Sequence, residues 1–195
     1  MPVGRPKGFD TADVLRRAIS VFWQKGYDAT TVKDLVSATG IGRQSLYNEF
    51  GDKRSLFAQA IQSYRDGETR YMIDLLQNAP TARDGLRAFF DAALDSGFDG
   101  ARRGCFLTNS IAIRTPEDEE LCALMDQSVN GLKTAFVGCI KRGIAAGEIS
   151  DELDPDALGF LYFSQGQGLS VVGKCQTCRE TADESIDLLL SLLDD

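Results

Sequence analysis

Cysteine is the residue type with the greatest capacity for chemistry in this sequence, which holds five cysteines and no histidine. Cys175 and Cys178 form a CxxC pair, a spacing found in redox enzymes and in half of many zinc sites. The sequence has no second CxxC and no strand-helix-strand pattern around the first, so carboxylates or a second copy of the chain would have to complete a metal site. Redox or metal switching by this pair stands beside a simpler interpretation, in which both cysteines are ordinary loop residues.

Cys105 is the second candidate for thiol chemistry. It follows Gly104 at the start of a predicted short helix, and Arg102 and Arg103 precede it. A helix N-terminus and nearby guanidinium groups both stabilise a thiolate, which predicts a thiol that reacts with electrophiles or oxidants. The competing interpretation is that this segment packs a bend between helices, because a free cysteine is often a buried apolar residue.

The absence of histidine limits the enzyme classes that fit. Histidine is the commonest general base and the commonest zinc or copper ligand, and every Ser-His or Cys-His nucleophile pair requires it. We therefore expect no enzyme activity, no catalytic residue, no bound metal and no cofactor.

The composition is that of a globular protein, with 43% hydrophobic and 26% charged residues over 195 positions. No apolar run approaches the roughly 18 residues of a membrane span, and the first residues, MPVGRPKGFD, lack the apolar segment of a signal peptide. Five cysteines over a chain of this length do not resemble a disulfide framework. We expect a cytoplasmic protein with reduced thiols and no membrane partner.

Charge is distributed unevenly along the chain, whose formal net charge is −8. Residues 1–54 hold nine Lys and Arg against six Asp and Glu, whereas the remainder holds 12 against 23. A basic end on an acidic body indicates a nucleic-acid-binding segment at the N-terminal end.

Three short helices are predicted in this basic segment. The first follows Asp10 as N-cap and stops at Gly26, the second follows Thr31 and ends before Gly40, and the third is RQSLYNEF, residues 43–50. The turn between the last two has three residues, contains glycine and completes a helix-turn-helix unit.

The outward side chains of the third helix carry donors suited to base edges and phosphates. They are Arg43, Gln44, Ser45, Tyr47 and Asn48. Lys53 follows at the next helix start, and a basic arm with Arg5 and Lys7 suits a minor groove. The alternatives are solvated surface for Arg43 and Gln44, core packing for Tyr47, and a disordered tail for the arm.

Residues 9–57 resemble the DNA-binding domain of the TetR family of transcriptional regulators. The matching residues are Phe22, Lys25-Gly26-Tyr27, Thr30-Thr31-Val32, Gly40-Ile41, Leu46-Tyr47, Phe50 and Lys53. The resemblance implies that Tyr47 and Lys53 hold phosphates, that Thr31 meets the DNA backbone, and that Arg43, Gln44 and Asn48 read bases.

The sequence departs from the family pattern at three positions. Val36 stands where the family usually has a small alanine, Gly42 where it often has serine or threonine, and Glu49 where histidine or another aromatic residue is frequent. Glu49 would repel a phosphate, so we expect it to face away from DNA or to accept from a cytosine amino group.

The rest of the chain predicts further helices, so the fold class is all-α, with about nine helices in two domains at 1–52 and 53–195. One helix runs from Asp52 toward Gln77. Others begin at Thr81, near Cys105, at 115–118, at Asp154 and at Thr181.

By the resemblance, the second domain binds a small effector and dimerises through the last two helices, about 154–174 and 181–194. Candidate pocket residues are Tyr64, Phe89, Phe90, Cys105, Phe136 and Phe160, although aromatic residues at helical spacing also fit a plain core. A homodimer would bind a palindromic operator in double-stranded DNA and repress transcription until an effector or thiol modification releases it.

Two other functions remain open from the sequence. One is a helical adaptor that binds protein and whose DNA head is vestigial. The other is a redox protein built on the CxxC pair.

Overall fold

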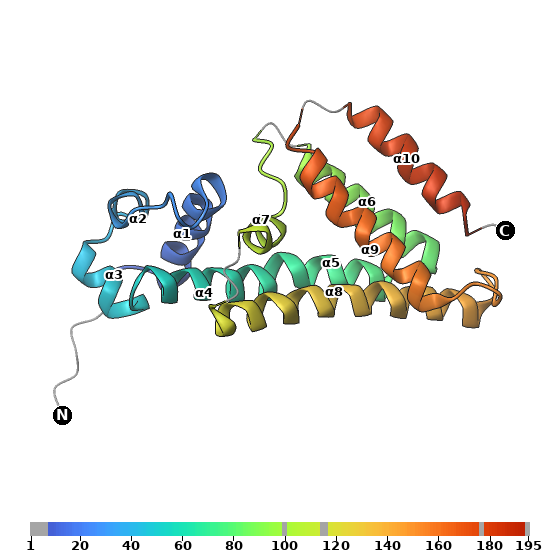
Figure 1. Cartoon of the computed structure of the whole chain (residues 1–195), viewed down its shortest axis with the longest axis horizontal. Coiled ribbons are helices and arrows are strands. Elements are labelled where there is room, and N and C mark those ends of the chain that lie inside the picture. The colour runs from blue at the N-terminus through green and yellow to red at the C-terminus, as the bar shows by residue number, and fades with distance from the viewer. Residues whose placement is uncertain (1–7, 99–100, 114–116, 176–177, 194–195) are drawn as a thin grey trace. The chain divides into compact units, whose positions relative to one another are not determined.

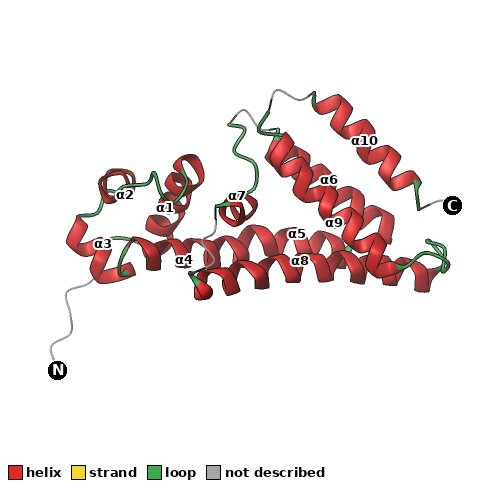
Figure 2. Cartoon of the chain, in the orientation of Figure 1, coloured by secondary structure: helices red, strands yellow, loops and turns green. Residues whose placement is uncertain are grey.

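The computed structural model describes residues 8–98, 101–113, 117–175 and 178–193. These residues form helices and no strand, as Figures 1 and 2 show, which confirms the all-α prediction. The chain divides into two compact units, 1–64 and 65–195. The fourth helix belongs to the first of these units, because it packs against the first helix.

The first unit contains α1 (Thr11–Lys25), α2 (Val32–Thr39), α3 (Arg43–Phe50) and α4 (Lys53–Tyr64). The predicted caps are confirmed: the Asp10 carboxylate accepts from the N–H of Ala12, and Thr31 forms a capping box with Asp34. α1 packs against both α2 and α4. Its buried face includes Phe22, whose ring meets that of Phe57 edge-on with centroids 5.0 Å apart.

The helix predicted from Asp52 toward Gln77 is helical throughout 53–78, but its hydrogen-bond pattern changes within it. A π-helical segment, η1 (Arg65–Thr69), separates α4 from α5 (Arg70–Asn78). Gly67, a poor α-helix former, lies at the centre of η1. The apolar spacing of the sequence does not reveal this change, because residues on both sides keep a helical period.

The second unit contains α6 (Ala82–Gly97), α7 (Phe106–Ala112), α8 (Glu119–Ala146), α9 (Pro155–Val172) and α10 (Arg179–Ser191), in addition to η1 and α5. α5, α6, α8 and α9 pack around one apolar core, and α10 covers α6 (Figure 1). The predicted starts of α6, α8 and α9 are confirmed by their caps Thr81, Asp118 and Asp154.

The predicted start of the last helix at Thr181 is wrong. α10 begins at Arg179, and its N-cap is Cys178, which has an extended backbone with φ −74° and ψ 123°. Thr181 followed by Glu184 resembles a capping box, but the extended residue that begins the helix lies three positions earlier.

Candidate DNA-binding interface

The turn between α2 and α3 fixes the helix-turn-helix unit. Gly40 is left-handed, with φ 74° and ψ 6°, and its N–H closes α2 on the carbonyl of Val36 at 3.0 Å. This conformation favours glycine. A side chain at Gly42, the N-cap of α3, would have no atom within 4 Å, so the start of α3 is open to a large ligand.

Buried and exposed residues alternate around α3 with helical period. Leu46 and Phe50 are each 2% exposed and anchor the helix in the core of the first unit. Arg43, Gln44, Ser45 and Asn48 are exposed, and Tyr47 is half-buried. The structure therefore brings together the five side chains that the sequence predicts for α3.

Two side-chain pairs order the exposed surface of α3. Arg43 donates to the hydroxyl of Tyr47 at 3.3 Å, and its guanidinium carbon lies 5.3 Å from the centre of the Tyr47 ring. Gln44 Nε2 donates to Asn48 Oδ1 at 2.8 Å. Both pairs join residues four apart, which are neighbours on a helix surface.

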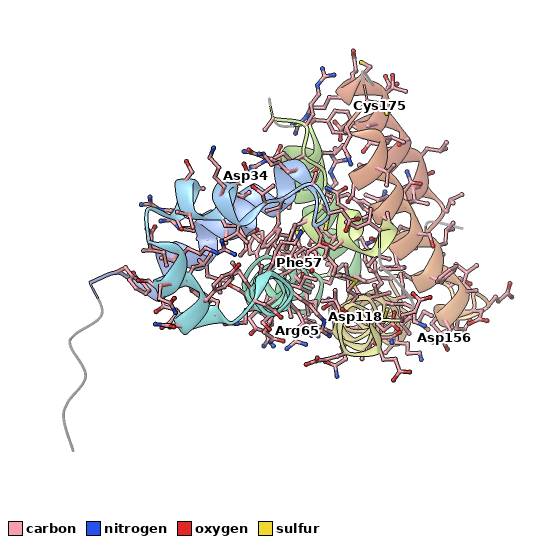
Figure 3. All side chains as sticks on the ribbon, turned by 60° about the vertical axis from the view of Figure 1, so that its left-hand side comes forward. Asp34, Phe57, Arg65, Asp118, Asp156 and Cys175 are labelled. Atoms are coloured by element: carbon pink, nitrogen blue, oxygen red, sulfur yellow. The ribbon has the colours of Figure 1, made fainter. Side chains whose placement is uncertain are left out.

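The N-terminus of α2 carries a carboxylate beside the predicted DNA contact Thr31. Asp34 Oδ2 accepts from the Thr31 N–H at 2.9 Å and from its hydroxyl at 2.7 Å, and Asp34 Oδ1 pairs with Lys25 Nζ at 2.6 Å. The hydrogen bond from Lys25 is the largest cause, and the hydrogen bonds from Thr31 are the next, of a pKa of Asp34 that lies well below its usual range. Lys25 thus offsets the negative charge next to Thr31, a role that the sequence analysis missed (Asp34 is labelled in Figure 3).

Lys53 has a structural role that the sequence analysis also missed. Its ammonium donates to the carbonyls of Tyr27 and Thr30, at 2.9 Å and 3.0 Å, and lies 4.3 Å from the centre of the Tyr27 ring. Lys53 therefore ties the start of α4 to the turn that leads into α2. An ammonium has three N–H donors, so these two bonds leave one for another acceptor.

Glu49, which departs from the family pattern, contacts the start of α1. Its carboxylate accepts from the hydroxyl of Thr11, at the start of α1, at 3.1 Å. Nothing in the local pattern around Glu49 identifies Thr11 as its partner, because 38 positions separate them. Arg5 and Lys7 of the basic arm lie outside the described residues.

The six candidate effector-pocket residues lie in different environments. Phe89, Phe90 and Phe136 are at most 3% exposed and pack ring against ring, with Phe89 and Phe136 centroids 4.6 Å apart. Phe160 is a surface residue, 57% exposed, and Tyr64 belongs to the first unit, where it meets Trp23 edge-on. The three core rings fit the plain-core alternative, and Phe160 lies at the surface of the single chain.

The cysteines lie in very different environments. Cys105 is the half-buried N-cap of α7. Cys139 is buried, and burial raises the pKa of its thiol to about 11. Cys175, just beyond α9 (Figure 3), and Cys178 are exposed, and the backbone N–H groups of Thr181 and Glu180 lower the pKa of Cys178. Within the described ranges, no cluster of three or more His, Cys, Asp or Glu side chains could hold a metal ion.

Comparison with known proteins agrees with this arrangement. Residues 14–60 match the family model for bacterial regulatory proteins of the tetR family, and residues 80–188 match the model for the tetracyclin repressor-like C-terminal domain. The regulator YezE of Bacillus subtilis (strain 168) is 34% identical over 195 residues, which cover 98% of this chain and 100% of YezE. The repressor ComR of Escherichia coli (strain K12) is 29% identical over 171 residues, or 86% of this chain and 81% of ComR.

A solved structure shows the same fold bound to DNA. A cysteine mutant of the TetR family regulator CifR, complexed with 26-bp operator DNA, matches with a TM-score of 0.86 and 31% identity, over 96% of this chain and 98% of that one. The fold and the helix-turn-helix unit define a DNA-binding transcriptional regulator. The chain belongs to the TetR family of bacterial regulatory proteins. None of its described helices is long and apolar enough to cross a membrane.

Proposed function

We propose that this chain represses transcription by binding a palindromic operator as a homodimer, and that a small-molecule effector or thiol modification releases it. The observation that carries the proposal is the exposed polar face of α3, held in place by the buried Leu46 and Phe50. The relative ComR is a repressor, and the CifR structure contains operator DNA. A dimer on its operator represses by blocking access to the promoter.

Within this proposal, α3 enters the major groove, and Arg43, Gln44 and Asn48 face the bases while Ser45 supplies a further donor. Tyr47 and the remaining N–H of Lys53 contact phosphates, which position the helix without reading sequence. Thr31 meets the DNA backbone when its hydroxyl turns from Asp34 to a phosphate. Arg5 and Lys7 of the N-terminal arm enter the adjacent minor groove.

The dimer contact is proposed on α9 and α10. Of the eight large apolar side chains that are exposed among the described residues, five lie on these helices and a sixth is the C-cap of α10. They are Phe160, Leu161, Val171, Val172, Leu188 and Leu192. Large apolar side chains that stay exposed in the single chain are candidates for an interaction surface, and the two-fold symmetry of such a dimer matches a palindromic operator.

The proposal is tested by selecting bound duplexes from a random library and measuring the affinity of the enriched sequence by gel shift. We expect a palindromic consensus. Arg43→Ala should weaken binding to this consensus by on the order of 10- to 100-fold and should relax the base preference at one position per half-site. An absence of any enriched sequence would instead favour the adaptor with a vestigial DNA head.

Lys53→Ala serves as the contrast to Arg43→Ala. Loss of a phosphate contact weakens binding to every duplex alike and reduces the slope of log affinity against log salt by about 0.9 per phosphate in each head. A variant that loses affinity with an unchanged slope would assign Lys53 to holding the α1–α2 turn alone.

Thiol reactivity tests the second route of release. Cys178 is exposed and its pKa is lowered, whereas Cys139 is buried and its pKa is raised to about 11. We therefore expect iodoacetamide to label Cys178 at least about 100-fold faster than Cys139 at about pH 7.5. Mass spectrometry of the labelled peptides gives both rates.

The same reaction, followed by gel shift, tests Cys105. Thiol modification would be supported as the switch if the operator is released at the rate at which Cys105 is labelled, and if the Cys105→Ser variant does not release the operator. Labelling of Cys105 no faster than that of glutathione, without release, would leave the small-molecule effector as the only proposed switch. Release that follows labelling of Cys175 and Cys178 would transfer the switch to the CxxC pair.

A further inference from the structure

The amides of Gln44 and Asn48 form a pair in the DNA-free protein. Gln44 Nε2 donates to Asn48 Oδ1 at 2.8 Å, and both side chains are exposed on α3. Gln44 lies in the first turn of the helix and Asn48 in the next. The N-terminal residues of a recognition helix are the ones that contact base edges, so the two amides occupy unequal positions relative to the groove.

The hydrogen bond to Asn48 uses some of the hydrogen-bonding groups of Gln44 and leaves others available. A glutamine amide has two N–H donors and one carbonyl acceptor. The bond to Asn48 uses one donor, which leaves one N–H and the carbonyl oxygen of Gln44 for a ligand. This remainder matches adenine, which presents the N7 acceptor and the N6 donor side by side in the major groove.

The bond also fixes which way the Gln44 amide faces. An unrestrained glutamine side chain loses rotamer freedom when it binds a base, and its amide can present oxygen and nitrogen in either order. In the observed arrangement Asn48 presents Oδ1, so the Nε2 of Gln44 is turned toward Asn48. Arg43 does not disturb this choice, because its guanidinium group is paired with Tyr47.

We infer that Asn48 positions Gln44 to read the adenine of an A·T base pair in each operator half-site. This inference rests on the proposed binding of DNA by α3. It assigns base contact to Gln44, and it gives Asn48 an orienting role in place of the direct base contact proposed above.

The test measures discrimination separately from affinity. Competition gel shifts would compare the selected operator with duplexes in which each base pair of a half-site is replaced in turn. The proteins are the wild type, Gln44→Ala, Asn48→Ala and Asn48→Asp. Asn48→Asp retains an oxygen that accepts from Gln44 Nε2, but its negative charge repels phosphates.

We expect Gln44→Ala to abolish the preference for A·T at one base pair per half-site, a loss of on the order of 10- to 100-fold in discrimination. Asn48→Ala should reduce discrimination at that same base pair. Asn48→Asp should keep this discrimination while weakening binding to all duplexes alike. Because both residues are exposed, these variants should unfold at the wild-type temperature.

Two results would overturn the inference while leaving DNA binding by α3 intact. In one, Asn48→Ala relaxes a different base pair and leaves the Gln44 position unchanged, so that Asn48 reads a base itself. In the other, Gln44→Ala retains every base preference of the wild type. Failure of the wild type to prefer any sequence would instead contradict the proposed function.

Discussion

Replacement of Phe160 and Leu188 by glutamate is expected to convert the proposed homodimer into a folded monomer and to weaken operator binding at least about 100-fold. The two side chains are 57% and 69% exposed in the single chain, so a carboxylate at either position stays in water when the chain is monomeric. In a dimer formed through α9 and α10 the same carboxylates would be buried without partners, which is strongly unfavourable.

Loss of the dimer should reduce affinity much more than loss of any single base contact. Two linked heads bind two half-sites at once, and the second head binds at a high effective concentration. A monomer binds one half-site only. Light scattering after size-exclusion chromatography would give the oligomeric state, and gel shifts would give the affinity.

The matched control is Tyr71→Glu. Tyr71 is 54% exposed, but it lies on α5 and not on the proposed dimer surface. This variant should remain dimeric and bind the operator as the wild type does. A Phe160/Leu188 double variant that stays dimeric would show that the subunits associate through another surface.

The position of α10 in the second unit is set by both apolar and polar contacts, which should keep the monomeric variant folded. Ile186 and Leu190 are buried, and Arg87 of α6 donates to Asp183 at 2.7 Å and to Asp187 at 2.5 Å. Leu188 lies on the opposite side of the helix from these contacts, as its exposure shows.

Gly104→Ala is expected to destabilise the second unit by about 3 kcal/mol. Gly104 has a left-handed backbone with φ +64°, and a Cβ there would lie 2.3 Å from the backbone oxygen of Ser170 in α9. An α-helical carbonyl cannot rotate away as a side chain can, so the segment before α7 would have to move. Urea unfolding followed by circular dichroism measures the change.

Gly138→Ala is the matched control for this prediction. Gly138 is exposed in α8, and a Cβ there meets nothing within 4 Å. Alanine in a helix interior is favoured over glycine by about 1 kcal/mol, so this variant should be more stable than the wild type. Equal stability of Gly104→Ala and wild type would mean that the segment is not seated against α9.

The contacts around Gly104 connect its position to the proposed regulation through Cys105. Thr108 donates to Gln167 at 2.8 Å and Lys174 donates to Asn109 at 3.0 Å, so α7 is hydrogen-bonded to α9 and to the segment just after it. Because α9 carries part of the proposed dimer surface, displacement of this segment offers a physical route from Cys105 to the subunit contact.

Local structure was determined by the sequence. Asp10, Thr31, Thr81 and Asp154 cap their helices as predicted, and Gly40 has the left-handed conformation expected at the end of α2. These features depend on hydrogen bonds within about four residues, so the necessary information lies in one short stretch. The pattern of residues 9–57 likewise sufficed to indicate the family.

Tertiary structure decided which side chains meet over long separations. An aromatic residue at helical spacing, such as Phe89, Phe136 or Phe160, fits a core, a pocket or a surface equally well. Only the packing of the helices placed Phe89 and Phe136 in the core and Phe160 at the surface. The partners of Lys53 and the close approach of Gly104 to Ser170 join different elements of the chain. Such contacts depend on how helices pack, and no local pattern in the sequence records that.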